Sequence, residues 1–139
     1  MVSGKKETKI QRVIFDTDVL IWYFRGNAKA KEFIESIPYE ERCISSLIYM
    51  ELLQGCLNKK ELKDVKAFVD ENFANIIHPN EVASEKAIAL MERFTLSHGL
   101  RVVDALVAAI TIEQGLQLAS ANTGHYRFIK DIQLLPFEP

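Results

Sequence analysis

Asp16, Glu51 and Asp104 lie in apolar stretches of this sequence, where a role in solubility does not explain their presence. Asp16 comes directly after a short β-branched and aromatic run, and Asp18 follows it closely. Glu51 lies in the segment LIYMELL and, at 3.6 residues per turn, points along the apolar face of a predicted helix. Asp104 is the only acid in residues 100–112. Acids in such positions are candidates for catalysis or metal binding.

The chemistry of these carboxylates depends on whether their three segments meet in the fold. A buried carboxylate without a partner is costly, so each needs a cation, a donor or a water-filled cleft. If Asp16, Glu51 and Asp104 converge, their repulsion raises their pKa values unless a multivalent cation neutralises them. Hard oxygen ligands select Mg²⁺ or Mn²⁺. Such a metal generates hydroxide from bound water and clamps a phosphodiester, so the sequence indicates nuclease chemistry.

Each of these acids also has a plain structural interpretation. Glu51 can extend to the rim of its helix or pair with a lysine. Asp104 can be the N-cap of the helix that follows it, where a carboxylate accepts hydrogen bonds from first-turn amides. Asp18 can start its own helix in the same way. For Asp104, capping and metal binding are compatible.

Strands alternate with helices along the chain, and their order predicts how the acids are positioned. We expect strands at residues 12–16, 42–45, 75–78, 116–120 and 133–135. We expect helices at residues 18–24, 29–37, 46–53, 59–73, 84–97 and 102–113, with a helical turn at 123–129. The helix at 102–113 is apolar on nearly every side and should run through the middle of the domain. The pattern predicts an α/β fold, a three-layer α/β/α arrangement around a mostly parallel sheet, whose strand carboxyl ends form ligand sites.

Composition limits the classes of function. The 139 residues suffice for one domain, placed at residues 12–139 after a flexible tail at 1–11. A hydrophobic share of 48%, 26% charged residues and a formal charge of −2 give no general attraction to nucleic acid or anionic membrane. A polyanionic substrate therefore requires a metal or local basic residues. No apolar run is long enough to span a membrane. Cys43 and Cys56 suit the reduced thiols of a cytoplasmic protein, although a single disulfide is also compatible with the sequence.

Four stretches of the chain resemble, in order and spacing, the PIN-domain family and within it the VapC-like toxins of toxin–antitoxin pairs. They are residues 13–21, 44–55, 103–109 and 118–126. The resemblance implies a sheet of five parallel strands and an acidic pocket that holds Mg²⁺ or Mn²⁺. It also implies an endoribonuclease whose activity on RNA is released when a small antitoxin protein is removed. A homodimer is implied as well.

The resemblance assigns roles to particular side chains. Asp16, Glu51 and Asp104 match the family's first three acidic positions, as metal ligands directly or through water. At the fourth position many relatives have an acid, and this chain has Asn122. An asparagine offers a carbonyl oxygen but no charge, which puts a second metal site in doubt.

Neighbouring positions show further matches and departures. Thr17 and Ser120 fall where the family often has hydroxyls that orient the pocket, although a hydroxyl there can equally cap a helix or end a strand. Asp18 occupies a position where the family accepts Asn, Ser or Asp. His125 stands where another acid is frequent, and Tyr126 where an aromatic is usual.

Two other functions compete with the nuclease interpretation. Asp16 and Asp18 also resemble the Asp-x-Asp start of haloacid-dehalogenase-type phosphatases, as nucleophile and general acid/base. That class requires a paired acidic motif after a later strand, which this chain lacks. The second alternative is a catalytically silent PIN-like module that binds protein or RNA, and Asn122 keeps this alternative open.

Overall fold

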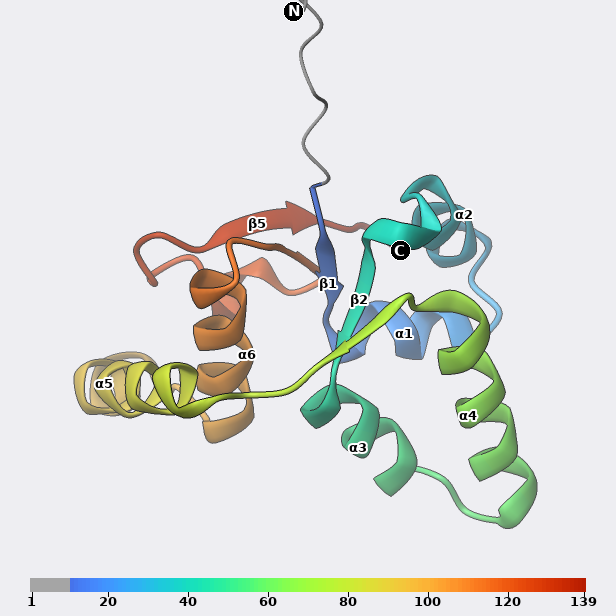
Figure 1. Ribbon diagram of the computed structural model, residues 1–139, viewed down its shortest axis with the longest axis horizontal. Coiled ribbons are helices and arrows are strands. Elements are labelled where there is room, and N and C mark those ends of the chain that lie inside the picture. The colour runs from blue at the N-terminus through green and yellow to red at the C-terminus, as the bar shows by residue number, and fades with distance from the viewer. Residues whose placement is uncertain (1–10) are drawn as a thin grey trace, which may run out of the picture.

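A central parallel sheet organises the structure, a computed structural model that describes residues 11–139. Its strands are β1 (Val13–Phe15), β2 (Arg42–Ser45), β3 (Asn75–Ile77), β4 (Gln117–Ser120) and β5 (Gln133–Pro136), hydrogen-bonded in the order β3-β2-β1-β4-β5 (Figure 1). All four pairings are parallel. The α/β fold and the five-stranded parallel sheet are thus confirmed. Most of the predicted tail, residues 1–10, lies outside the described residues.

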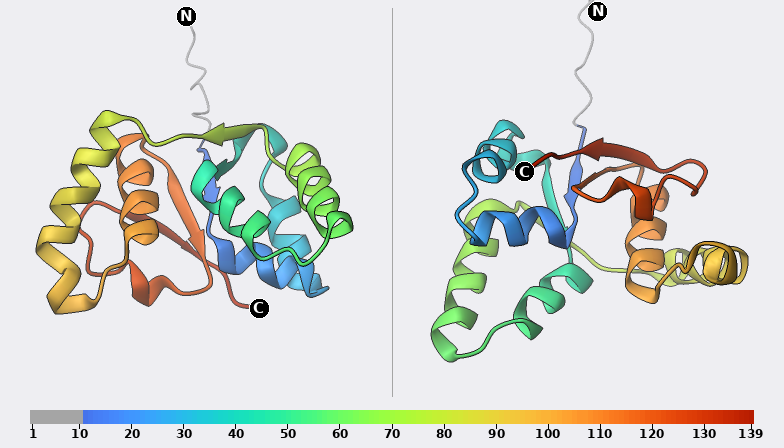
Figure 2. Two further views of the ribbon diagram at one scale, coloured as in Figure 1. Left: turned by 90° about the horizontal axis from the view of Figure 1, so that it is seen from below. Right: turned by 180° about the vertical axis from the view of Figure 1, so that it is seen from behind.

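Helices cover both faces of this sheet. They are α1 (Thr17–Phe24), α2 (Ala28–Ser36), α3 (Ser46–Gln54), α4 (Lys59–Asn72), α5 (Glu81–His98) and α6 (Val102–Glu113), with 3-10 turns η1 (Tyr39–Glu41) and η2 (Thr123–His125). Helices α5 and α6 lie on one side of the sheet and α1 to α4 on the other (Figure 2). Helix α6 packs between the sheet and α5, and its residues 107–111 are all buried. Its predicted course through the middle of the domain is confirmed.

Polar caps set the ends of the helices. The Ser45 hydroxyl accepts a hydrogen bond from the Ile48 amide at 3.0 Å, as the sequence predicts for the start of α3. The Asn80 side chain accepts one from the Ala83 amide at 2.8 Å. Helix α5 therefore begins at Glu81, three residues earlier than predicted, because Asn80 is a stronger cap than the residues that follow it.

The described part of the chain contains no helix with the length and apolar character needed to cross a membrane. Cys43 is buried, Cys56 is partly buried, and both are free thiols. The interpretation of the two cysteines as reduced thiols is therefore the one that the structure supports.

Candidate functional site

The carboxyl ends of the strands and the first turns of three helices meet along one edge of the sheet. Helices α1 and α3 start where β1 and β2 end, and α6 starts on the same side (Figure 1). Strand β4 lies directly beside β1, with Phe15 opposite Ala119, and the Asp16 amide donates to the Ala119 carbonyl at 2.8 Å. This register places Asp16 beside Ser120, although the two are 104 residues apart in sequence.

The hydroxyl of Ser120 joins two acids of β1 and α1. It lies 3.0 Å from Asp16 Oδ2 and 3.3 Å from Asp18 Oδ2, and it accepts a hydrogen bond from the Asn122 amide at 3.0 Å. Ser120 is fully buried, so these contacts hold its side chain in one orientation. The orienting role suggested for Ser120 agrees with this geometry.

Asp18 does not cap its helix. The N-cap of α1 is Asp16, whose Oδ1 accepts from the Thr17 amide at 2.9 Å. Asp18 is the second residue of α1, and its Oδ1 accepts a hydrogen bond from the Ala121 amide at 3.1 Å. The capping interpretation of Asp18 was therefore wrong, because the helix begins one residue earlier than predicted and Asp18 faces the end of β4.

Glu51 reaches the same edge from α3. The Thr17 hydroxyl donates to Glu51 Oε1 at 2.7 Å, which links the first turn of α1 to the second turn of α3. Within residues 11–139, Glu51 forms no ion pair with a lysine or an arginine. The alternative in which Glu51 pairs with a lysine is thus not what the structure shows, and Thr17 orients an acid rather than capping a helix.

Asp104 is held by a tyrosine hydroxyl. It is the third residue of α6, whose N-cap is Arg101 and has no side-chain cap, so the capping interpretation of Asp104 was wrong. Instead, the Tyr126 hydroxyl donates to Asp104 Oδ1 at 3.2 Å. Tyr126 is fully buried, and its hydroxyl also lies close enough to Asp16 to lower the pKa of that carboxyl. Tyr126 therefore donates to Asp104 from a position near Asp16, and we call this its bridging role.

This bridging role is the functional feature that sequence reasoning missed. The only signal was the position of Tyr126 as an aromatic after a polar loop, which predicts packing but not a hydrogen bond across 22 residues. The backbone amide of Ala121 was missed as well, because its partner Asp18 lies on a distant segment.

Asn122 and His125 form a separate pair at the rim. Asn122 Nδ2 lies 3.1 Å from His125 Nε2, and His125 Nδ1 lies 3.9 Å from Asp104 Oδ2. Both residues are exposed. The amide of Asn122 is thus engaged with an imidazole at the edge of the acidic site, while its backbone amide contacts Ser120.

Burial and negative charge together raise the pKa values of Asp16 and Tyr126 at the centre of the site. Burial, and secondly the neighbouring Asp18 carboxylate, raise the pKa of Asp16 from 3.8 to about 6, against the lowering effects of its hydrogen bonds. Burial and the two nearby carboxylates raise the pKa of Tyr126 far above its usual value, so its hydroxyl stays protonated and donates. No three acidic, histidine or cysteine side chains among residues 11–139 are already arranged to hold a metal ion. Asp16, Glu51 and Asp104 are brought to one edge, and each accepts a hydrogen bond from a hydroxyl group.

Two hollows open from this edge. One, of about 610 Å³, is lined by both Glu51 and Asp104 together with Arg101. The other, of about 490 Å³, is lined by Thr17 and Glu51 and continues between α1 and α4 past Arg25. Glu51 lines both hollows, so an extended ligand can pass in front of the acids.

Comparison with known proteins identifies the family. Residues 13–130 match the family model of the PIN domain. The chain belongs to the PIN-domain family. This PIN domain is 26% identical over 122 residues to ribonuclease VapC10 of Mycobacterium tuberculosis, which covers 87% of the chain and 90% of the relative.

Solved structures agree with this assignment. A chain of a toxin–antitoxin complex from Klebsiella pneumoniae is 28% identical, with a TM-score of 0.73 over 91% of this chain and 99% of that chain. VapBC2 from Rickettsia felis, solved with a DNA fragment from its promoter, gives a TM-score of 0.78 at 16% identity, over 92% and 100% of the two chains. The second likeness concerns the fold alone.

Proposed function

We propose that this PIN domain is a metal-dependent endoribonuclease and the toxin of a type II toxin–antitoxin pair. The family and the VapC ribonuclease relative support the ribonuclease activity. The observation that carries the proposal is the buried Tyr126 hydroxyl, which donates to Asp104 and lies near Asp16, with Glu51 across the adjoining hollow. One buried hydroxyl beside two acids from distant segments is an arrangement that a purely structural role does not require.

The donor set fits a hard divalent cation, Mg²⁺ or Mn²⁺. The raised pKa of Asp16 shows that burial and repulsion by Asp18 are not offset by a cationic side chain of the described residues. Mg²⁺ keeps several waters and needs only one or two carboxylates, so the hydroxyl-linked spacing of the acids suits it. Asp16 and Asp104 would hold the ion directly, and Glu51 would do so directly or through water.

Each hydroxyl at the edge has a defined task in the proposed hydrolysis. Thr17 fixes Glu51, Ser120 fixes Asp16, and Tyr126 fixes Asp104, so the carboxylates do not have to be ordered when RNA binds. When bound, the metal polarises the phosphodiester and lowers the pKa of the attacking water. Water adds to phosphorus and one P–O ester bond breaks, which leaves a phosphate monoester and a hydroxyl.

The partners follow from the same relationship. The relative from Klebsiella pneumoniae is part of a toxin–antitoxin complex, and we propose that a small antitoxin protein covers this chain as well. We further propose that the protein acts on RNA in the cytoplasm and forms a homodimer.

A second candidate function rests on Asn122. The side chain at the fourth acidic position carries no charge and lies against His125, so a second metal site has no support. A PIN domain that binds RNA or protein without cutting it is compatible with this feature.

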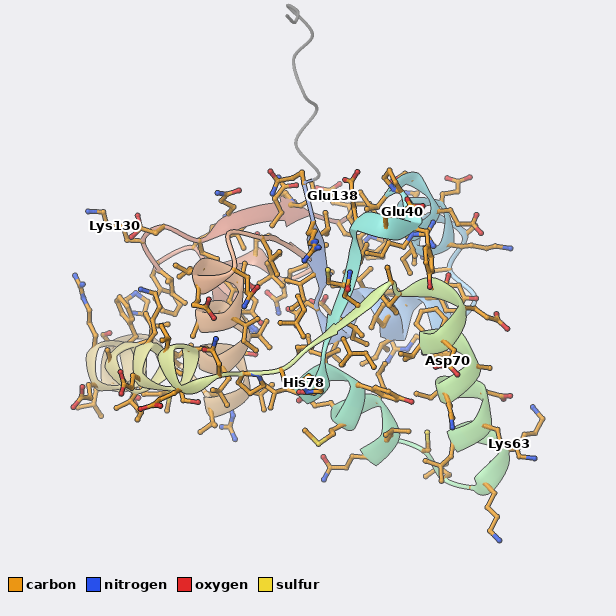
Figure 3. The ribbon with its side chains drawn as sticks, viewed as in Figure 1. Glu40, Lys63, Asp70, His78, Lys130 and Glu138 are labelled. Atoms are coloured by element: carbon orange, nitrogen blue, oxygen red, sulfur yellow. The ribbon has the colours of Figure 1, made fainter. Side chains whose placement is uncertain are left out.

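One experiment separates the two functions. Purified protein, free of antitoxin, is incubated with structured RNA and Mg²⁺ or Mn²⁺, beside a chelator control. We expect cleavage by the wild type and none with chelator or in Asp104→Asn, while Asp70→Asn, an exposed acid on α4 (Figure 3), cuts normally. If clean wild type binds RNA but cuts none, the silent module is correct. Equal cutting by Asp104→Asn contradicts the proposed site.

A further inference from the structure

A third hollow, of about 190 Å³, lies on the far side of Asp104. It is lined by the end of α5, the first turn of α6 and the loop of η2, through His98, Arg101, Asp104, His125 and Phe128. Arg101 and Asp104 also line the 610 Å³ hollow that contains Glu51. The small hollow thus adjoins the proposed catalytic edge. Its volume is below that of pockets for drug-sized ligands, so it suits a single planar ring system.

Two aromatic rings, His98 and Phe128, line this hollow, and Phe94 packs against both of them; we name Phe94, His98 and Phe128 the ring cluster. His98 is stacked on Phe128, with centroids 4.1 Å apart and planes 19° apart. Phe94 meets both edge-on, at 5.5 and 4.8 Å. The Ser97 hydroxyl lies 2.8 Å from His98 Nδ1. The ring of His98 is therefore fixed on one face while its residue remains exposed to solvent.

Positive charge accompanies the ring cluster. Arg101 is exposed at the boundary between the two hollows, and the Arg93 guanidinium lies 5.2 Å from the centre of the Phe94 ring. Neither arginine forms an ion pair within the described residues. In a chain of formal charge −2, Arg101 thus supplies a positive charge at the small hollow, and Arg93 supplies one at the ring cluster.

We propose that this hollow binds the unpaired nucleotide next to the cleaved phosphodiester, with its base against the His98 ring and its phosphate on Arg101. The proposal rests on the proposed ribonuclease function, which it deepens by giving the substrate a single-stranded flanking base. Exposed aromatic faces stack bases of single-stranded RNA with little dependence on sequence. Arginine binds phosphate through two parallel N–H groups. Glu51 lines the 610 Å³ hollow, Asp104 and Arg101 line both hollows, and His98 lines the small one. This arrangement matches a scissile phosphate, a neighbouring phosphate and a base.

The test measures RNA binding without cleavage. Full-length protein in chelator is titrated into labelled oligouridylate and into a ribose-phosphate oligomer of equal length that lacks all bases. Base stacking contributes on the order of 1–3 kcal/mol, so His98→Ala should weaken oligouridylate binding about 5- to 150-fold. It should leave binding of the abasic oligomer unchanged. His98→Phe should restore the loss, and Arg101→Gln should weaken both ligands because its contact is with phosphate.

The matched control is His78→Ala, which removes another exposed imidazole outside the three hollows (Figure 3). Thermal unfolding of each variant shows whether it is folded. Equal binding of oligouridylate by wild type and His98→Ala, or no RNA binding by the wild type, overturns the subsite. Base-dependent binding through His98 without any RNA cleavage in Mg²⁺ or Mn²⁺ supports the subsite and overturns the ribonuclease function. RNA cleavage at equal rates by wild type and His98→Ala supports the ribonuclease function and overturns the subsite.

Discussion

Replacing Asp16 with asparagine should stabilise the metal-free protein at neutral pH while it abolishes RNA cleavage. Folding raises the pKa of Asp16 from 3.8 to about 6, chiefly through burial and then through Asp18. The ionised carboxylate is therefore less favourable in the folded chain than in the unfolded one. Once Asp16 is ionised, that difference lowers the unfolding free energy of the wild type by roughly 3 kcal/mol. An asparagine keeps the cap to the Thr17 amide and carries no charge at any pH.

The sign of the effect fixes its pH dependence. Below about pH 3 the carboxyl is protonated in both the folded and the unfolded state, and wild type and variant should be nearly equal. As pH rises from about 3 to about 6 the unfolded chain ionises first, so the wild type loses stability relative to Asp16→Asn. The gap should be about 1 kcal/mol at pH 4.5 and about 3 kcal/mol at pH 7.5.

Urea denaturation followed by circular dichroism, in chelator at these two pH values, measures the gap. Asp70→Asn, which neutralises an exposed acid on α4, should show no such growth with pH (Figure 3). Adding Mg²⁺ should stabilise the wild type more than Asp16→Asn, because only the ionised carboxylate gains a cation. A gap that stays constant between pH 4.5 and 7.5, or that favours the wild type, would refute the reasoning.

Substitutions at three further positions test the contacts that support the site and the core. Tyr126→Phe removes the buried hydroxyl that bridges to Asp104, so RNA cleavage should fall about 10- to 100-fold in a single-turnover assay, and unfolding free energy should fall by about 1–3 kcal/mol. Thr17→Val frees Glu51, and we expect a similar loss of cleavage with Thr17→Ser retaining activity; an active Val variant would contradict the orienting role. Ile110→Ala leaves a cavity in α6, where the isoleucine is 1% exposed, and urea denaturation should show a loss of roughly 2–5 kcal/mol.

Local patterns predicted most of the fold. Strand β2 (Arg42–Ser45) and helix α6 (Val102–Glu113) have the predicted bounds. The strand lies between Pro38 and the helix cap at Ser45, and the helix is apolar on nearly every side, so both are marked by local signals. Asp16, Glu51 and Asp104 also reach one edge of the sheet as predicted, since parallel strands place their carboxyl ends together. These features depend on short-range sequence information.

The connections within the site could not be predicted in this way. Asp18 and Asp104 suit helix N-termini by residue type, but each instead accepts a hydrogen bond from a later segment, 103 and 22 residues away respectively. The partner of a buried hydroxyl such as that of Tyr126 depends on the register of β1 against β4, which no local pattern encodes. Pocket geometry at the ring cluster depends on the packing of α5 against the η2 loop in the same way.

The pairing of β1 with β4 makes the site a late product of protein synthesis. A nascent chain that has emerged through α6 already carries Asp16, Glu51 and Asp104, but it lacks the strand and loop that supply Ser120 and Tyr126. Its acids then lack the hydroxyls that contact Asp16 and Asp104 in the complete sheet. A polypeptide that has emerged only through α6 therefore does not yet have the assembled site of this ribonuclease.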